Sequence, residues 1–455
     1  MRYTVTITEV LMQRLLDEVF SKEGCEGAAY MLCGRSSTAG ELRFLVRSVV
    51  PVLDEEYRVR EPLRLSIDSV SYARIAKRAF ADGASIMFVH SHPKGIADFS
   101  PQDDREEPKL MTFLSKRAPD RIHGSIVVSG PDELRSRAWV NGEWIPIERF
   151  RSIGSRFRFL DGRAGNVVQP EAWFDRQVAA FGPSVQNLLS TLHVGIVGCG
   201  GSGSAVAEQL CRLGVGAMSL FDGDKLDGSN VTRVYGSKIG DIGTNKAEIL
   251  KRHLEEIGLG TRIDAFPKYI SVEEAAKELR SCDLVFSCTD LETPRALLVQ
   301  LALRYLIPVF DLGIKISSEQ GIVCDITGRV TTLLPGEACL FCRGRISPDT
   351  IRVEQLAPDE RKRLVAEGYA PELEERNPAV VMFTTAVAAQ ALMEFMHRIT
   401  GYMGSDRKSS EVLPQFHNGR IGKNREKPGD QCLCARQDIW ARGDSRDFLG
   451  VTWAT

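Results

Sequence analysis

The sequence lacks several features that would place it in a special class of protein. It has no run of about 18 apolar residues, so no membrane-spanning helix is expected. Its first twenty residues show no charged stretch followed by an apolar core and therefore do not resemble a secretory signal. Lys and Arg number 58 against 60 Asp and Glu, so no excess of positive charge favours nucleic acid. We expect a cytoplasmic protein that binds neither nucleic acid nor membrane.

The composition is that of ordinary globular domains. The chain has 455 residues, of which 43% are apolar and 26% charged, and it shows no repeat of fixed period. At roughly 100–200 residues per domain, this length predicts two or three domains. In a cytoplasmic protein, the eleven cysteines are expected to be free thiols or metal ligands rather than disulfides.

The pattern of the chain predicts two α/β domains joined by a linker. Residues 151–170 are rich in Arg and Gly without clear periodicity, and we interpret them as the linker between domains at 1–150 and 171–455. In the second domain, a strand at Leu192–Val197, a glycine-rich turn, a helix and a strand at Ala217–Phe221 predict the opening of a parallel, nucleotide-binding sheet. In the first domain, the spacing of apolar residues predicts a helix at Ser69–Asp82. We expect strands at Glu41–Leu53, Ala84–Val89, Gly124–Val128 and Arg137–Trp144.

The first candidate site is the segment VHSHPKGIADFSPQDD, residues 89–104. His90 and His92 flank one serine at the end of an expected strand, where side chains two apart point to the same face. Two such imidazoles, with Asp103 as a third ligand, can bind one Zn²⁺ and leave a fourth position for water, as in catalytic sites. The alternative is that the histidines merely end a strand and that Ser100 caps a helix.

The spacing H-S-H, seven residues, Ser, two residues, Asp resembles the signature of the JAMM (MPN-type) zinc metalloproteases. That family cleaves isopeptide or peptide bonds after the C-terminal glycine of ubiquitin-like proteins. The resemblance covers residues 1–150 and implies a JAMM-type α/β domain with a catalytic zinc ion on His90, His92 and Asp103. It further implies that Ser100 helps to hold the carbonyl oxyanion.

The same resemblance implies an upstream glutamate as the general base. The segment EGCEGAAYMLCG offers Glu26, which is our choice, and Glu23, which is the alternative. The spacing from Glu26 to Gly34 is one residue longer than the family pattern, so the alternative stays open.

The second candidate site begins with the glycine-rich turn GCGGSGS, residues 198–204. Glycines let the backbone approach phosphates, and the N-terminus of the following helix favours their negative charge. Asp222, after the second strand, could hold a ribose, as in NAD enzymes, so a nicotinamide-dependent oxidoreductase is an alternative. Residues that can neutralise a triphosphate or bind Mg²⁺ favour ATP instead; they are Asp224, Asn230, Arg233, Lys246 and Asp290.

This set resembles the ubiquitin-like-protein activating enzymes, including members that serve thiamin and molybdopterin synthesis, from Glu171 to Cys434. The resemblance implies a Rossmann-like, doubly wound domain that adenylates the C-terminal glycine of a small β-grasp protein with MgATP. It implies a homodimer in which Arg176 reaches the ATP of the partner subunit. The residues implied around the nucleotide are Gly198, Gly200, Gly201, Gly203, Ser204, Asp222, Asp224, Asn230, Arg233, Lys246 and Asp290, the last on Mg²⁺.

Two cysteine pairs predict a structural zinc site in the second domain. Cys339 and Cys342 form C-x-x-C, and Cys432 and Cys434 form C-x-C. Four thiolates make a closed tetrahedral site. The family has C-x-x-C twice, so the second pair departs from its pattern.

The stretch from Arg343 to Gln431 contains no cysteine, whereas family members that form a thioester carry one there. This disfavours a thioester on this chain and leaves transfer to an acceptor or to a cysteine of another protein, such as a carrier or conjugating enzyme. Together the two domains predict a bifunctional enzyme of a bacterial ubiquitin-like pathway. The alternatives are sulfur-carrier activation for biosynthesis and a scaffold that only binds the tail of its partner.

Overall fold

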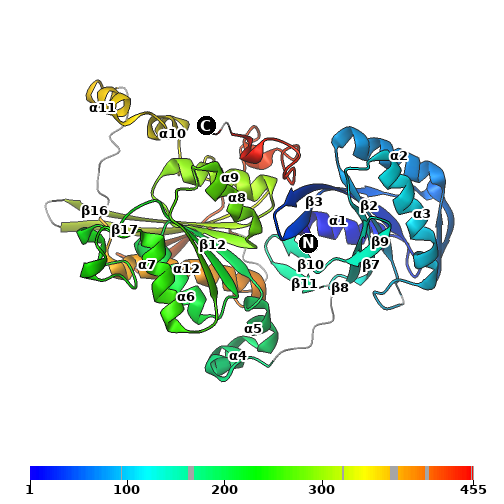
Figure 1. Cartoon of the computed structure of the whole chain (residues 1–455), viewed down its shortest axis with the longest axis horizontal. Coiled ribbons are helices and arrows are strands. Elements are labelled where there is room, and N and C mark those ends of the chain that lie inside the picture. Colours follow the sequence, from blue (N-terminus) through cyan, green and yellow to red (C-terminus); the bar gives the residue numbers. More distant parts are fainter. Residues whose placement is uncertain are drawn as a thin grey trace. The chain divides into compact units, whose positions relative to one another are not determined.

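The computed structural model (Figure 1) describes residues 1–93, 95–161, 169–319, 322–368, 378–404, 409–451 and 453. The chain forms two compact units. The first comprises Met1–Asn166, Arg304–Leu306 and Gln437–Gly450, and the second comprises Val167–Leu303, Ile307–Arg436 and Val451–Thr455. Among the described residues, no helix is both long enough and apolar enough to cross a bilayer.

The first unit is built on a nine-stranded mixed sheet in the order β11-β10-β1-β3-β2-β6-β7-β8-β9. Strands β4 and β5 form a separate two-stranded hairpin, which lies between β3 and α2 in the sequence. The elements are β1 Arg2–Thr8, α1 Glu9–Val19, β2 Ala28–Ser37, β3 Glu41–Pro51, β4 Tyr57–Glu61, β5 Arg64–Ile67, α2 Ser69–Asp82, β6 Ser85–Ser91, α3 Pro101–Arg117, β7 His123–Gly130, β8 Glu133–Val140, β9 Glu143–Pro146, β10 Arg149–Ile153 and β11 Arg158–Asp161.

Both faces of this sheet are covered by helices, which makes its central strands fully buried. Alternate residues of β2 enter two different cores, Met31 on one face and Tyr30 on the other. Helix α1 packs against the first face through Leu15, and α2 and α3 pack against the second through residues such as Ile75 and Met111. Strand β6, which carries the H-S-H motif, lies between β2 and β7 and is buried along its whole length.

Local capping explains where two helices of this unit begin. Asp68 accepts the N–H of Val70 at the start of α2, and the helix spans the predicted Ser69–Asp82. Ser100 caps α3, with Pro101 in its first turn. The prediction of a single strand over residues 137–144 is wrong, because this segment spans the hairpin that joins β8 and β9. Asn141 and Gly142 both have positive φ at its tip, as a two-residue turn requires.

The segment 151–170, expected to be a linker, begins with ordered strands. Strand β10 pairs with β1, and β11 pairs with β10, so both extend the sheet of the first unit. The charge of Arg151 argued against a buried strand at this position. The structure shows that Arg151 is buried because it pairs with Glu41 at 3.1 Å. Residues 162–168 of the expected linker lie outside the described residues, and the domain limits remain a prediction.

The C-terminal segment also contributes to the first unit, although its sequence carries little signal. Gly443 forms a β-bridge with Arg35 in β2, and the Asp444 carboxylate accepts the backbone N–H of Ser37 at 2.6 Å. The segment Gln437–Gly450, near the end of the chain, therefore belongs to the same compact unit as its first residues.

The second unit contains an eight-stranded sheet in the order β14-β13-β12-β15-β16-β17-β18-β19. The first five strands are parallel and Rossmann-like, and the last three are antiparallel, which confirms the α/β class. Figure 1 shows α8 and α9 on one side of this sheet and α6, α7 and α12 on the other. The elements are α4 Asp175–Phe181, α5 Pro183–Leu189, β12 His193–Val197, α6 Gly201–Arg212, β13 Ala217–Phe221, α7 Lys246–Ile257, β14 Arg262–Phe266, α8 Glu273–Glu278, β15 Leu284–Ser287, α9 Glu292–Arg304, β16 Val309–Glu319, β17 Ile322–Leu333, α10 Pro348–Glu354, α11 Pro358–Ala366, α12 Val381–Thr400, β18 Glu411–Gln415 and β19 Arg420–Asn424.

Candidate functional sites

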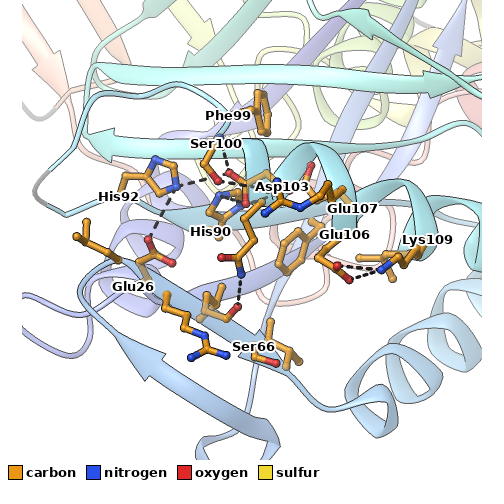
Figure 2. Close-up of a pocket in the computed structure, with 18 of the residues that line it drawn as sticks. Glu26, Ser66, His90, His92, Phe99, Ser100, Asp103, Glu106, Glu107 and Lys109 are labelled. Carbon is orange, nitrogen blue, oxygen red and sulfur yellow. Dashed lines mark hydrogen bonds and ion pairs between the residues drawn. The ribbon is translucent and has the colours of Figure 1, made fainter.

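Three side chains of the H-S-H segment converge in the first unit. His90 is the penultimate residue of β6, His92 directly follows the strand, and Asp103 lies in the first turn of α3. The Nε2 atoms of His90 and His92 lie 3.4 and 3.8 Å from the two carboxylate oxygens of Asp103. One donor atom from each residue lies within 4.8 Å of the others. Figure 2 shows the three pointing toward one another.

The surroundings of these donors fit a bound zinc ion. His90 is 2% exposed, and among the described residues its ring nitrogens make no close hydrogen bond: Nε2 lies 3.4 Å from Asp103 and Nδ1 lies 3.5 Å from the Glu107 carboxylate. The Nδ1 atom of His92 lies 3.4 Å from the Ile96 carbonyl oxygen, which leaves its Nε2 to face Asp103. Two imidazole nitrogens and one carboxylate oxygen are ligands that zinc takes at about 2.0–2.2 Å, so a cation among them would satisfy the buried nitrogen.

The electrostatics of the site are those of a cluster rich in carboxylates. Burial by itself lowers the pKa of His90, but Asp103, Glu107 and Glu26 outweigh burial and leave that pKa raised. Burial opposes ionisation of Asp103 as well, yet His90 and Ser100 hold the pKa of its carboxyl below the usual range. The cluster therefore favours positive charge at its centre.

Glu26 lies beside these ligands, whereas Glu23 is exposed. Its Oε1 atom lies 4.0 Å from Nε2 of His92, and its side chain is almost completely buried. Burial raises the pKa of Glu26 to about 7, against the opposing effect of His90. A carboxyl group that titrates near neutral pH is suited to general base catalysis.

Ser100 positions Asp103 by reciprocal capping at the start of α3. The Asp103 backbone N–H donates to Ser100 Oγ at 3.2 Å, and the Ser100 N–H donates to Asp103 Oδ2 at 2.7 Å. A cleft of about 1000 Å³ opens onto this cluster and is lined by the β4–β5 hairpin and by α3. A substrate chain therefore has room to reach Glu26 and Ser100.

Two residues that the sequence analysis did not single out support the ligands. Ser91, the central residue of the motif, accepts the N–H of Gly27 at 3.0 Å and so fixes the segment that carries Glu26. Glu107 is buried on α3, and its Oε1 lies 3.5 Å from Nδ1 of His90. Glu107 follows Asp103 by four residues and so lies on the same face of the helix; this spacing could have identified it from the sequence.

The glycine-rich turn of the second unit connects β12 to α6. Gly198 has φ +91°, and a Cβ there would lie 2.7 Å from the backbone oxygen of Cys288. A Cβ at Gly203 would collide with the Gly198 carbonyl oxygen. Gly200 and Gly201 begin α6. The turn is thus as tight as backbone approach to a phosphate requires, and the helix N-terminus follows it.

Acidic and basic side chains gather after β13. The Asp222 carboxylate accepts the N–H groups of Cys199 and Asp224 at 2.7 and 2.8 Å, and burial raises the pKa of Asp222. Lys246 pairs with Asp224 at 2.9 Å. Asn245, which the sequence analysis missed, donates to the carbonyl oxygens of Asp222 and Asp224 and caps α7.

The remaining expected nucleotide residues differ in how they are placed. Arg233 lies against Gly201, because a Cβ there would be 3.4 Å from Arg233 Cδ. Asp290 is exposed in the loop after β15. Asn230 is buried in a short helical turn that it helps to cap. Ser204 is fully buried; its hydroxyl accepts the N–H of Tyr235 and donates to the carbonyl oxygen of Gly201 at 3.3 Å.

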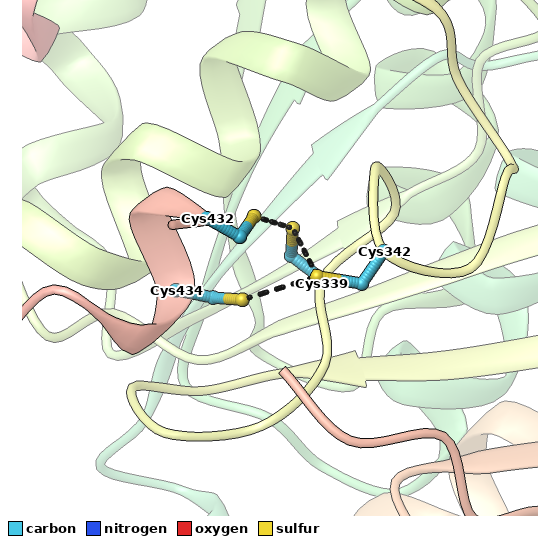
Figure 3. Close-up of side chains that lie close together, drawn as sticks. All are labelled: Cys339, Cys342, Cys432 and Cys434. Carbon is cyan, nitrogen blue, oxygen red and sulfur yellow. Dashed lines mark hydrogen bonds between the residues drawn. The ribbon is translucent and has the colours of Figure 1, made fainter. Parts of the chain in front are cut away.

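The two expected cysteine pairs come together in the second unit (Figure 3). The Sγ atoms of Cys339 and Cys432, and those of Cys342 and Cys434, lie 3.5 Å apart, and all four lie within 4.8 Å of one another. Four sulfurs at 2.3 Å from one zinc ion lie roughly 3.8 Å apart, so this spacing fits a tetrahedral site. The shortened C-x-C pair still brings both thiols to the cluster.

Comparison with known proteins gives one family and several partial relatives. The ThiF family matches residues 174–434. The chain is 28% identical over 152 residues to tRNA threonylcarbamoyladenosine dehydratase of Escherichia coli, which covers 32% of this chain and 57% of that protein. It is 27% identical over 263 residues to ubiquitin-like modifier-activating enzyme 5 of Drosophila ananassae, covering 55% and 61%. It is 32% identical over 109 residues to the sulfur carrier protein adenylyltransferase of Thermus thermophilus, covering 24% and 40%.

The chain therefore spans about half the length of these curated relatives. The family match begins at residue 174 and does not include the histidine cluster of the first unit.

Proposed function

The chain belongs to the ThiF family, and we propose that its second unit activates the C-terminal glycine carboxylate of a small ubiquitin-like protein with ATP. A carboxylate oxygen bonds to the α-phosphorus of ATP, an acyl-adenylate forms and pyrophosphate leaves. The observation that carries this proposal is the family match over residues 174–434. The names of the Drosophila and Thermus relatives support a small protein as the substrate.

The proposal assigns roles to the backbone of the glycine-rich turn and to four nearby side chains. The backbone from Gly198 to Gly203 and the N-terminus of α6 contact phosphates. Asp222 binds the ribose, as the acid after the second strand does in dinucleotide sites. Arg233 and Lys246 neutralise the triphosphate, and the exposed Asp290 contributes a carboxylate to Mg²⁺.

We further propose that the first unit is a zinc peptidase that cleaves after the same glycine. The observation that carries this is the convergence of His90, His92 and Asp103 next to the buried Glu26. Zinc, when bound, supplies Lewis acidity that lowers the pKa of a coordinated water molecule to about 7. Glu26 takes a proton at its carboxylate and delivers it to the leaving amine, and the Ser100 hydroxyl helps to hold the carbonyl oxygen.

ATP–pyrophosphate exchange tests the adenylation proposal. Purified full-length protein is incubated with MgATP and a panel of ubiquitin-like and sulfur-carrier proteins, each paired with a version that lacks its C-terminal glycine. Exchange is expected only with a protein that keeps the glycine, and Asp290→Ala is expected to abolish it. Absence of exchange with the whole panel would favour the scaffold alternative.

Cleavage of an extended substrate tests the peptidase proposal separately. The protein that supports exchange is fused through its C-terminal glycine to a reporter domain. Cleavage is expected after the glycine, to be lost on zinc chelation and in His92→Ala, and to persist in Asp290→Ala. Cleavage that survives both chelation and His92→Ala would reject the zinc assignment without affecting the adenylation result.

Sulfur-carrier activation is the second candidate function. The absence of cysteine between Arg343 and Gln431 favours transfer of the adenylate to an external nucleophile, and the name of the Thermus relative favours sulfur as that nucleophile. Intact mass spectrometry after addition of sulfide distinguishes the routes. A thiocarboxylate on the small protein supports sulfur transfer, whereas an amide bond to an acceptor supports conjugation.

A further inference from the structure

Glu107 is a buried carboxylate in contact with a zinc ligand, yet it lies outside the ligand set. Its side chain is 5% exposed, and its Oε1 lies 3.5 Å from Nδ1 of His90, on the side of the ring opposite Asp103. Figure 2 shows Glu107 one helical turn beyond Asp103 and next to His90. A buried carboxylate is costly unless it is paired, so its position calls for a physical reason.

Two further residues fix Glu107 in place. The Ser125 hydroxyl donates to its Oε1 at 2.6 Å, and the Arg137 guanidinium pairs with its Oε2 at 2.6 Å. Arg137 is itself held between the rings of Phe99 and Trp144, whose centroids lie 3.6 and 4.0 Å from its Cζ. Glu107 therefore cannot turn away from His90 without losing its bonds to both Ser125 and Arg137.

This arrangement determines which nitrogen of His90 is available. A carboxylate accepts hydrogen bonds, so Glu107 favours the tautomer that carries its proton on Nδ1. The lone pair then lies on Nε2, which faces Asp103. His92 shows the same arrangement, because its Nδ1 faces the Ile96 carbonyl oxygen. Both imidazoles thus present Nε2 to the same point.

We propose that Glu107, held by Ser125 and Arg137, is a positioning residue that orients His90 and sets its tautomer for zinc. The inference rests on the proposed zinc site of the first unit. Carboxylates that accept the free N–H of a metal-bound histidine typically change metal affinity 10- to 100-fold when removed. Glu107 would act in this way without touching the ion.

Zinc affinity, measured by competition with a chelator, tests the inference on full-length protein. Glu107→Ala is expected to weaken zinc binding at this site about 10- to 100-fold. Glu107→Gln keeps an acceptor oxygen of similar size and is expected to retain part of the affinity, and Ser125→Ala is expected to cause a smaller loss. Glu106→Gln is the matched control, because Glu106 is exposed on the same helix and pairs with Lys109; wild-type affinity is expected.

A second readout separates positioning from a general loss of structure. Nitrogen NMR of the histidine side chains reports the tautomer, and the Nδ1–H form of His90 is expected in zinc-loaded wild type and Glu107→Gln. Circular dichroism identifies any variant that does not fold, and the Gln and Ser125 variants then carry the test. Wild-type affinity in a folded Glu107→Ala protein would overturn the inference. If the wild type binds no zinc that depends on His92, the proposed zinc site itself fails.

Discussion

The backbone N–H of Gly27 donates to the Oγ of Ser91 at 3.0 Å, and this bond links the two segments of the candidate zinc site. Ser91 lies between the two histidines on β6, and Gly27 follows Glu26. The Ser91 hydroxyl also donates to the carbonyl oxygen of Val19 at 2.7 Å. The serine of the motif therefore holds the proposed general base next to the proposed ligands.

Ser91→Ala is expected to displace Glu26 and to lower peptidase kcat by roughly 10- to 100-fold, because catalysis is sensitive to small misplacements. The unpaired Gly27 N–H and Val19 carbonyl should also cost about 1–3 kcal/mol of unfolding free energy. Kinetics and urea denaturation measure both effects. Ser129→Ala, in a partly exposed position on β7, is the control and should behave as wild type. Full activity of Ser91→Ala would separate Glu26 from this bond.

The two glutamates before β2 form a matched pair for testing the general base. Glu26→Gln is expected to retain zinc, because Glu26 is not a ligand, and to lose cleavage by about 10²- to 10⁴-fold. Glu23→Gln should leave cleavage unchanged, because Glu23 is exposed. Zinc content by elemental analysis and single-turnover cleavage measure the two properties. The reverse pattern would show that Glu23 is the base.

The proposed homodimer can be tested by mixing two inactive variants. Arg176 is exposed on α4, and the family resemblance implies that it reaches the ATP of a second copy. Arg176→Ala and Asp290→Ala should each lose pyrophosphate exchange, yet an equal mixture of co-expressed chains should regain about one quarter of wild-type exchange, since mixed dimers contain one intact site. A mixture that stays inactive would place Arg176 at the ATP of its own chain.

The four-cysteine cluster predicts that zinc stabilises the second unit. Cys342→Ser is expected to remove one zinc ion per chain and to lower the unfolding temperature of the second unit by roughly 5–10 °C, because structural zinc contributes directly to folding. Cleavage by the first unit should persist. Cys324→Ser, at an exposed cysteine outside the cluster, is the control. An unchanged zinc content in Cys342→Ser would reject the site.

His123 predicts a loss of stability in mild acid. Its Nδ1 accepts the backbone N–H of Ile86, and burial lowers its pKa from 6.5 to about 4. His123 therefore binds a proton below pH 6.5 in the unfolded chain, but only below about pH 4 in the folded chain. The stability of the first unit should be full above pH 6.5 and fall by about 3 kcal/mol towards pH 4.

Urea denaturation followed through Trp139, which is paired with His123 across β7 and β8, measures this effect. His123→Gln keeps an acceptor but cannot be protonated, so its stability should vary less over the same pH range. An equally steep profile in His123→Gln would assign the acid sensitivity to another group.

Local patterns were sufficient for much of the fold and for part of each site. The apolar spacing over Ser69–Asp82 placed α2 correctly, and the glycine turn with its flanking strands predicted the parallel sheet. The Asn141-Gly142 turn was overlooked although its residue types carry the signal. Strand β10, in contrast, could not be recognised from local sequence, because the buried Arg151 is neutralised by Glu41, which is distant in the sequence.

The sequence by itself determined the groups whose spacing is local, namely His90, His92, Ser100 and Asp103, because one strand and one helix turn fix them relative to one another. It also determined the family through the motifs of the second unit. Only the tertiary structure decided the partners that come from other elements. The structure places Glu26 rather than Glu23 beside His92, and Arg137 reaches Glu107 from β8. The sequence had already suggested that Cys432 and Cys434 meet the pair some ninety residues earlier, and the fold brings them together. Such contacts depend on strand pairing and burial, which no local spacing records.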